Sequence, residues 1–401
     1  MFNFLKNNVT KTTTKKVKWV TLDTYDKITE DLKKENIEVK YTMIISGRSD
    51  GKTTACLKRV LDNYVEKGEQ GAFIRRLDSN YTGSYKDNLF SFFISTGYVN
   101  KITKGEWTDV KYWRGGWFLS RYNEEKGKVE MQPEPFMFAF AISTTANSRG
   151  ASYSNVTTIV FDEFVAMSNE AELPDEFVTF SNLISTIMRQ RDNVQIYLLG
   201  NNNTRFSSYF KEMGLYNTKD MELGELNVYT IATDLKDENG KTRSLGIIVH
   251  RPDISKEDRP SKLLFCFDNS KTKMITEGSW AIATYPRLPF KYDKKNTVFY
   301  FYIELEDQII RGDVCIEGSN QFLYFYPKRD NYEVEENELL YQLSFSPSIY
   351  RQISPLVGIN DITKKIAQLI RLNKTFFANN EVGDIVTTYL EKSYKYNLFS
   401  I

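Results

Sequence analysis

The sequence predicts an α/β fold, with a large domain built on a mainly parallel sheet and a smaller α/β domain after it. Three observations predict this fold. In the first half, short apolar runs alternate with stretches of helical spacing. One of these runs leads into a helix through a glycine-containing loop. After residue 235 the chain becomes polar with glycine and proline, and new strand-like runs begin near residue 291. We expect domains at 1–235 and 291–401, joined by a linker at 236–290.

The apolar runs of the first domain have the length of buried strands. They lie at residues 41–45, 71–74, 136–142, 158–161 and 194–199. Helical spacing predicts helices over 52–66 and 175–189. A glycine turn between aromatic runs predicts a hairpin inserted over 107–122. Buried strands separated by helices indicate a parallel sheet covered on both faces.

The second domain shows a different pattern. Strands are expected within 297–310 and 313–325, with turn signals at 311–312 and 318–319. From Asp361 onward the apolar residues recur at helical spacing. These features predict a small α/β domain.

Composition excludes several classes of protein. The net charge of +1 gives no global attraction to nucleic acid, so such contacts would need local clusters. Cys56, Cys266 and Cys315 are too few and too far apart for a disulfide framework. Together with the single histidine, His250, they lack the spacing of ligands in a structural zinc site. No apolar run suits a signal peptide or a membrane span, so we expect a reducing, cytosolic compartment. The N-terminus has five lysines and no acid before Trp19. It predicts a solvated tail, with a phosphate-contacting arm as the alternative.

The loop after the first apolar run predicts a site for nucleotide phosphates. It reads Ser46-Gly47-Arg48-Ser49-Asp50-Gly51-Lys52-Thr53-Thr54. In such a P-loop the backbone N–H groups surround a phosphate, the lysine reaches the β and γ oxygens, and the hydroxyl of Thr53 serves Mg²⁺. Ser46 stands where the motif usually has its first glycine, and a chance turn is the alternative. We expect the Lys52 side chain to face solvent.

Two adjacent acids end the apolar run that begins at residue 157. Asp162, at the carboxyl end of a strand, is suited to hold Mg²⁺ through water. Glu163 is suited to polarise an attacking water as general base. A surface pair of carboxylates is the alternative, but the P-loop upstream favours hydrolysis.

Two amides follow the next apolar run. Asn201 and Asn202 come directly after Gly200. A side-chain amide at this position would sense the γ-phosphate and relay its loss. An asparagine-rich turn is the alternative.

In this order, the segments SGRSDGKTT, TTIVFDEF and YLLGNNNT resemble the ATPase domain of phage terminase large subunits. In type they are similar to the DNA-packaging ATPases, or encapsidation proteins, of small podophages with protein-primed genomes. Arg48 inside the loop and Phe164 after the acids are typical of that group. The resemblance covers roughly residues 20–235. It implies a P-loop NTPase of the additional-strand catalytic-glutamate type, with ATP and Mg²⁺ as cofactors.

The resemblance also implies partners. It implies a homo-oligomeric ring, a pentamer in this family, which moves double-stranded DNA through the portal, or connector, into a prohead. A packaging RNA is a further partner of this kind. Such a protein works in the host cytoplasm, transiently at the portal vertex, with no membrane partner and no place in the mature virion.

Site roles carry over by position. Lys52 and Thr53 match the phosphate and Mg²⁺ ligands of the family. Asp162 matches the Mg²⁺-linked acid and Glu163 the catalytic acid. Asn201 and Asn202 match the coupling motif.

Arg149 resembles, by its place in Ser148-Arg149-Gly150, the arginine finger that such proteins supply to a neighbouring subunit. A guanidinium delivered across an interface neutralises charge in the transition state. The competing candidates are Arg75, Arg76, Arg189 and Arg191.

The second domain departs from the larger terminases, whose nuclease has an RNase H-like fold with acids that hold two metal ions. The expected strand at 297–303 carries no acid, and we expect the acids near the following turn to be at the surface. These are Glu304, Glu306, Asp307 and Asp313. We therefore expect a nuclease-type fold that lacks catalytic acids. Four basic residues on the last helical stretch suit either nucleic-acid contacts or a solvated face. They are Lys364, Lys365, Arg371 and Lys374.

Three hypotheses follow. The first is an ATP-driven packaging motor. The second is a terminase large subunit with an active metal-dependent nuclease. The third is a non-hydrolysing, nucleotide-dependent structural component that binds nucleic acid, against which Glu163 argues, because a pure switch needs no base beside the Mg²⁺ acid.

Overall fold

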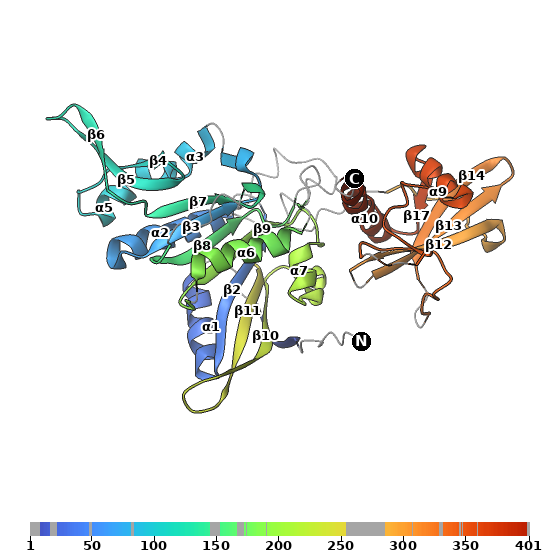
Figure 1. Cartoon of the computed structure of the whole chain (residues 1–401), viewed down its shortest axis with the longest axis horizontal. Coiled ribbons are helices and arrows are strands. Elements are labelled where there is room, and N and C mark those ends of the chain that lie inside the picture. The colour runs from blue at the N-terminus through green and yellow to red at the C-terminus, as the bar shows by residue number, and fades with distance from the viewer. Residues whose placement is uncertain are drawn as a thin grey trace. The chain divides into compact units, whose positions relative to one another are not determined.

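The computed structural model describes most of the chain (Figure 1). The described residues are 9–16, 22–47, 50–81, 84–144, 153–166, 172–173, 175–189, 191–253, 285–306, 308–328, 332–344, 346, 348–358 and 360–398. They fall into two compact units, one within residues 9–253 and one within 285–398. Each unit is an α/β fold, as predicted.

The first unit is organised around one sheet of 11 strands. The strands are β1 (Val9–Lys16), β2 (Ile37–Ser46), β3 (Gln70–Arg75), β4 (Asp109–Trp113), β5 (Gly116–Asn123), β6 (Lys128–Met131), β7 (Met137–Ala141), β8 (Val156–Asp162), β9 (Gln195–Asn201), β10 (Glu225–Lys236) and β11 (Thr242–Arg251). Their order is β1-β10-β11-β2-β9-β8-β3-β7-β5-β4, with β6 paired to β5. The strands from β11 to β7 are parallel to their neighbours, and antiparallel strands extend both sides. The predicted strands, and the hairpin formed by β4 and β5, are confirmed. Strand β9 is the additional strand, because it lies between β2 and β8.

Helices cover both faces of this sheet (Figure 1). They are α1 (Leu22–Lys34), α2 (Lys52–Lys67), α3 (Ser84–Asn88), α4 (Ser91–Ser95), α5 (Tyr98–Ile102), α6 (Glu176–Met188) and α7 (Ser208–Glu212), with 3₁₀ turns at Asp78–Tyr81 and Tyr216–Asp220. Alternation along β8 shows the two faces. Val160 packs in the cluster that holds buried residues of α1 and α2. Phe161, its neighbour, stacks on Phe180 of α6 with ring centroids 5.4 Å apart.

Glycines set both ends of α2, the helix that follows the P-loop. Gly51, just before the helix, has φ 75°, and Gly68, just after it, has φ 71°. Both angles are in the left-handed region that glycine adopts without a steric penalty. The backbone N–H of Gly68 donates to the carbonyl of Tyr64, which closes the last turn. The helix predicted over 52–66 is therefore confirmed.

The expected linker at 236–290 is wrong in its first part. Residues 242–251 form β11, which pairs in parallel with the P-loop strand β2. Only the second half of β11, from Gly246, is buried. Its first half is more exposed and polar, which is why the sequence there resembles a linker. Residues 254–284 of the expected linker lie outside the described residues, and 285–290 belong to the second unit.

The expectation of a solvated N-terminal tail is also wrong for residues 9–16. These residues form β1, which pairs with β10 in antiparallel fashion. Strand β1 is at the edge of the sheet, where lysines are common because they discourage pairing with other chains.

The second unit contains a sheet of 6 strands. They are β12 (Thr297–Leu305), β13 (Gln308–Glu317), β14 (Asn320–Pro327), β15 (Leu340–Tyr341), β16 (Arg351–Gln352) and β17 (Thr375–Phe377). The order is β16-β15-β12-β13-β14-β17, with β12, β13 and β14 antiparallel and the short strands parallel to their neighbours. The helices are α9 (Asp361–Arg371) and α10 (Asn380–Leu398), after a 3₁₀ turn at Lys294–Asn296. An antiparallel meander extended by parallel strands beside its first strand is the arrangement expected of an RNase H-like domain. Across the described ranges, no helix is both long and apolar enough to cross a membrane.

One of the two turn signals in this unit is wrong. Arg311 and Gly312 lie inside β13, and the chain reverses instead after Leu305. Gly312 is required by packing, because a Cβ there would lie 2.7 Å from Phe301 Cζ and 2.8 Å from Phe325 Cε1. The second signal is confirmed, since Gly318 has φ 59° between β13 and β14.

Candidate functional site

The sequence-predicted site residues meet where four strands end. In the order β2, β9, β8 and β3 the strands are parallel, so their carboxyl ends lie at one edge of the sheet. Ser46 pairs with Asn201, and Asp162 pairs with Leu199. Parallel α/β sheets bind ligands at this edge.

Lys52 is buried, and the expectation that it faces solvent is wrong. Its side chain is 6% exposed. Its Nζ donates to the carbonyl of Gly47 at 2.9 Å and to Oδ1 of Asn201 at 2.8 Å. The lysine therefore connects the beginning of the P-loop to the end of β9.

The described part of the P-loop joins the end of β2 to the first turn of α2. Ser46 is buried at the end of β2, and a Cβ on Gly47 would lie 3.2 Å from Oδ2 of Asp50. Thr53 is half-buried and Thr54 is exposed in the first turn of α2. Arg48 and Ser49 lie outside the described residues. A loop of this kind before a helix N-terminus presents backbone N–H groups to phosphate.

Thr53 and Asp162 together offer oxygen ligands of the type that Mg²⁺ prefers. The Thr53 hydroxyl donates to Oδ1 of Asp162 at 3.1 Å. Burial raises the pKa of Asp162, and the charge of Arg75 opposes that shift. These two residues fit the Mg²⁺ ion that accompanies a nucleotide.

Glu163 leaves the strand in an uncommon backbone conformation. Its φ is 60°, which costs a residue with a Cβ about 1–3 kcal/mol and persists only where surrounding contacts hold it. After this one residue the chain rejoins β9, because the N–H of Phe164 donates to the carbonyl of Leu199. The Glu163 side chain is 28% exposed, whereas that of Asp162 is 9% exposed.

Arg75, at the end of β3, joins the two acids. Its Nη1 donates to Oδ2 of Asp162 and its Nη2 to Oε2 of Glu163, both at 2.8 Å. The guanidinium also lies 5.0 Å from the ring centre of Tyr85. Arg75 was expected only as a competing candidate for the finger supplied to a neighbouring subunit, whereas it contacts the acids of its own chain. Arg75 ends an apolar strand, as Asp162 does, and this shared position in the sequence could have indicated that the two residues meet.

The other candidate fingers are placed as follows. Arg76 forms a buried ion pair with Glu176. Arg191 donates to the carbonyls of Tyr153, Val156 and Ile187. Arg189 ends α6. Arg149, the preferred candidate, lies outside the described residues.

Asn201, the last residue of β9, and Asn202, which follows it, are both buried. Asn201 contacts Lys52, as described above, and Asn202 is 1% exposed. Their predicted role as a sensor stays a prediction, but Asn201 lies where a change at Lys52 reaches β9 directly.

Gly200 allows the segment after Glu163 to lie against β9. A Cβ on Gly200 would lie 2.6 Å from Val165 Cγ2 and 2.9 Å from Phe164 Cε1. We expect Gly200→Ala to destabilise the fold by about 1–3 kcal/mol, the usual effect of overpacking, and to slow nucleotide hydrolysis by displacing Glu163. Thermal unfolding and steady-state turnover would measure both effects. An unchanged Tm with unchanged turnover would show that the segment moves away without consequence for the site.

In the second unit, the expectation that Asp313 is at the surface is wrong. Asp313 is fully buried on β13. Its carboxylate accepts hydrogen bonds from Tyr292, Thr297, Arg311 and Tyr326. Glu304 and Glu306 belong to β12 and the turn after it, and Asp307 lies outside the described residues. Among the described residues, no three acidic, cysteine or histidine side chains are close enough to share a metal ion.

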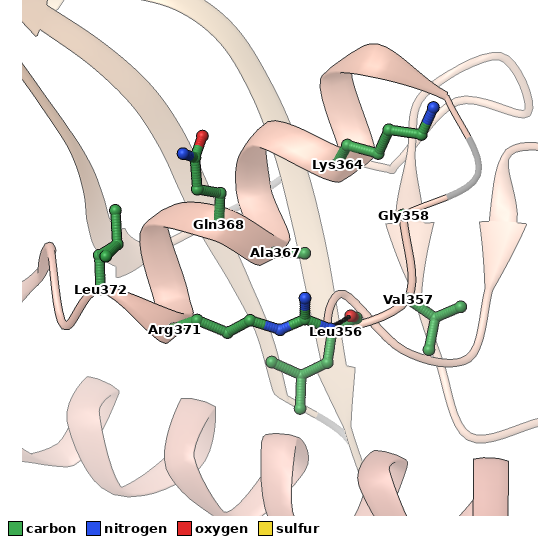
Figure 2. Close-up of a pocket in the computed structure, with 8 residues that line it drawn as sticks. All are labelled: Leu356, Val357, Gly358, Lys364, Ala367, Gln368, Arg371 and Leu372. Atoms are coloured by element: carbon green, nitrogen blue, oxygen red, sulfur yellow. Dashed lines mark hydrogen bonds between the residues drawn. The ribbon is translucent and has the colours of Figure 1, made fainter.

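The basic residues of the last helical stretch lie on and just after α9. Figure 2 shows Lys364 and Arg371 beside a hollow of about 550 Å³ whose other wall is the segment 356–358. Arg371 reaches across to donate to the carbonyl of Leu356 at 2.8 Å. Lys364 is exposed, Lys365 lies within 3.4 Å of Gln368, and Lys374 follows the helix.

The chain matches the family model of the podovirus DNA encapsidation protein (Gp16) over residues 28–248, which is more than half of its length. The chain belongs to this family. The matched region includes β2, β3, β8 and β9, so all the site residues named in the first unit lie within it.

Individual relatives cover less of the chain. The DNA packaging protein of Bacillus phage phi29 is 27% identical over 208 residues, which is 50% of this chain and 55% of that protein. The DNA packaging protein of Bacillus phage B103 is 25% identical over 175 residues, which is 43% of this chain and 47% of that protein. The chain therefore spans about half the length of the curated relatives it matches.

Two similar solved structures match at low sequence identity. The phi-28 gp11 DNA packaging motor is 17% identical, with a TM-score of 0.45, over 91% of this chain and 95% of that one. The N-terminal domain of the bacteriophage phi29 DNA packaging ATPase is 19% identical, with a TM-score of 0.38, over 56% of this chain and 94% of that one.

Proposed function

We propose that this encapsidation-family protein hydrolyses ATP to move double-stranded DNA into a phage prohead. The observation that carries the proposal is the convergence of Lys52, Thr53, Asp162 and Glu163 at the carboxyl ends of adjacent parallel strands. Family membership supports DNA as the cargo. The relatives from Bacillus phages phi29 and B103 are named DNA packaging proteins, which also supports DNA as the cargo.

The residues of the site divide the work of phosphoryl transfer. Mg²⁺ bound with ATP supplies positive charge to the phosphate oxygens. Thr53 and Asp162 would hold that ion, and Lys52 places its ammonium at the loop that would surround the phosphates. Since Asn201 contacts the same ammonium, a loss of phosphate contact at Lys52 is transmitted to the end of β9. Asn202 follows directly and completes this sensor.

Glu163 is the general base that takes a proton from the attacking water. In this structure Oε2 of Glu163 accepts a charge-assisted hydrogen bond from Arg75. A carboxylate accepts at both oxygens, so Oε1 can take the proton while Arg75 holds Oε2. Arg75 therefore orients the carboxylate of the base.

We further propose that the active form is a homo-oligomeric ring, a pentamer, in which Arg149 reaches the site of a neighbouring subunit. The portal, or connector, and a packaging RNA are the other partners of this proposal. The protein acts transiently at the portal vertex of proheads in the host cytoplasm. Among Arg75, Arg76 and Arg191, each side chain is engaged within its own subunit, which supports Arg149 as the finger.

The second unit, in this proposal, is a nuclease-type domain that no longer cleaves DNA. The carboxylate of Asp313 accepts hydrogen bonds from four side chains, so its oxygens are occupied by contacts within the domain and not by a metal ion. The first unit, whose sheet includes β11, hydrolyses ATP.

One experiment tests this function against its two alternatives. Purified protein is incubated with ATP and Mg²⁺, with and without double-stranded plasmid, at low salt, where backbone contacts to DNA are strong. We expect hydrolysis that DNA stimulates and plasmid that stays intact. Hydrolysis absent under both conditions would favour a structural nucleotide-binding component. Plasmid cleavage would favour a terminase with an active nuclease.

A further inference from the structure

Arg76 is a buried arginine whose hydrogen bonds go to the turn that carries Glu163. Its side chain is 3% exposed. Nη1 donates to the carbonyl of Glu163 at 3.1 Å, and Nη2 donates to the carbonyl of Phe164 at 2.6 Å. No such role belongs to its neighbour Arg75, which contacts the side chains of the acids instead. The two consecutive arginines therefore hold the same turn, one by its carboxylates and the other by its backbone.

Glu176, the first residue of α6, fixes the other side of the guanidinium. Nε of Arg76 donates to Oε2 of Glu176 at 2.8 Å, and Nη2 donates to Oε1 at 3.1 Å. The carboxylate also accepts from the N–H of Leu173 and from the hydroxyl of Tyr209 in α7. Because Glu176 is fully buried and accepts four hydrogen bonds from three residues, it has little freedom to move.

The turn needs such support because of its backbone conformation. Glu163 has φ 60°, a conformation that persists in a non-glycine residue only where surrounding contacts hold it. On one side, the N–H of Phe164 is bonded to the carbonyl of Leu199. On the other side, both carbonyls of the turn are bonded to Arg76.

We propose that Arg76, oriented by Glu176, is a positioning residue that holds the backbone of Glu163 so that its carboxylate reaches the hydrolysis site. This inference rests on the proposed function, in which Glu163 is the base. A buried ion pair contributes little net stability compared with apolar residues of similar size, so stability alone does not account for this pair. Its geometry does account for it, since one planar guanidinium joins α6 to both carbonyls of the turn.

The consequence for catalysis follows from geometry. A base displaced by about 1 Å loses roughly 10²-fold in rate, whereas nucleotide binding through the P-loop is unaffected. Arg76→Lys keeps the charge that faces Glu176, but its single nitrogen cannot reproduce the guanidinium fork. We expect Arg76→Lys to bind ATP normally and to hydrolyse it roughly 10–10²-fold more slowly in single turnovers.

The matched control is Arg191→Lys. Arg191 also donates to three backbone carbonyls, but these lie at the start of β8 and in α6, away from Glu163. We expect this variant to lose thermal stability with little change in the rate of hydrolysis. If Arg76→Lys and Arg191→Lys lose stability and rate in the same proportion, the role of Arg76 is only structural.

A double-mutant cycle separates positioning from a general defect. If Arg76 acts through Glu163, Arg76→Lys has no further effect on the residual rate of Glu163→Gln protein. Independent effects of the two substitutions would overturn the proposal. In case the Arg76 variant folds poorly, Arg76→Met combined with Glu176→Gln removes both charges together, and we expect the same loss of rate. If Glu163→Gln itself hydrolyses ATP at the normal rate, the proposed function fails. If only Glu163→Gln is slow and the Arg76 variants are normal, this inference alone fails.

Discussion

Glu163→Gln protein is expected to bind ATP with normal affinity and to hydrolyse it roughly 10²–10⁴-fold more slowly, the usual contribution of a general base. The amide has the shape of the carboxylate, and its oxygen can still accept a hydrogen bond from Arg75. It cannot take a proton from water. Equilibrium binding of a fluorescent ATP analogue and single-turnover hydrolysis would measure the two properties separately.

The control for this prediction is Glu130→Gln, because Glu130 on β6 pairs with Arg121 and Lys126 rather than with any residue of the site. It is expected to leave the rate of hydrolysis unchanged. Loss of ATP binding in the Glu163 variant would contradict the assignment, since it would make Glu163 a metal ligand or a structural residue instead of the base.

The parts of the fold that the sequence predicts well are those with a strong local signal. Strand β8 is a mainly apolar run that ends at the first of two adjacent acids. Helix α2 begins directly after Gly51, whose positive φ marks the turn that leads into the helix. Because parallel strands end at one edge of a sheet, the approximate site followed from these local patterns. Strand β11 was missed because half of it is exposed and its partner β2 is about 200 residues away in the chain.

The details that could not be predicted depend on contacts between distant residues. Lys52 and Asn201 are 149 positions apart, and nothing near Lys52 in the sequence indicates that its ammonium is buried. The same holds for Arg75, which meets Asp162 from a different strand. Asp313 read as a surface acid because its four hydrogen-bond donors are spread over residues 292–326. In each case the tertiary partner, not the local pattern, determines burial.

Lys52→Ala is expected to reduce ATP hydrolysis by roughly 10²–10³-fold or more, because it removes the positive charge at the phosphate loop. Since Lys52 is buried, the substitution also leaves Oδ1 of Asn201 and the carbonyl of Gly47 without this donor. An unmet buried acceptor costs about 1–3 kcal/mol, so a lower Tm is expected as well. Lys52→Met, which keeps the aliphatic part of the side chain, is the matched control for lost packing. Calorimetry with steady-state turnover would measure both effects, and near-normal turnover in either variant would remove the P-loop assignment.

Mixing this variant with Arg149→Ala protein extends the prediction to the ring. Lys52→Ala subunits keep their finger, and Arg149→Ala subunits keep their P-loop, so each supplies what the other lacks if Arg149 acts on a neighbour. Each variant alone is expected to stay near background, whereas mixed assemblies are expected to recover DNA-stimulated hydrolysis. A finger that acts within its own subunit would give no recovery at any ratio. An absence of recovery in mixed rings of confirmed composition would move the finger assignment to another arginine.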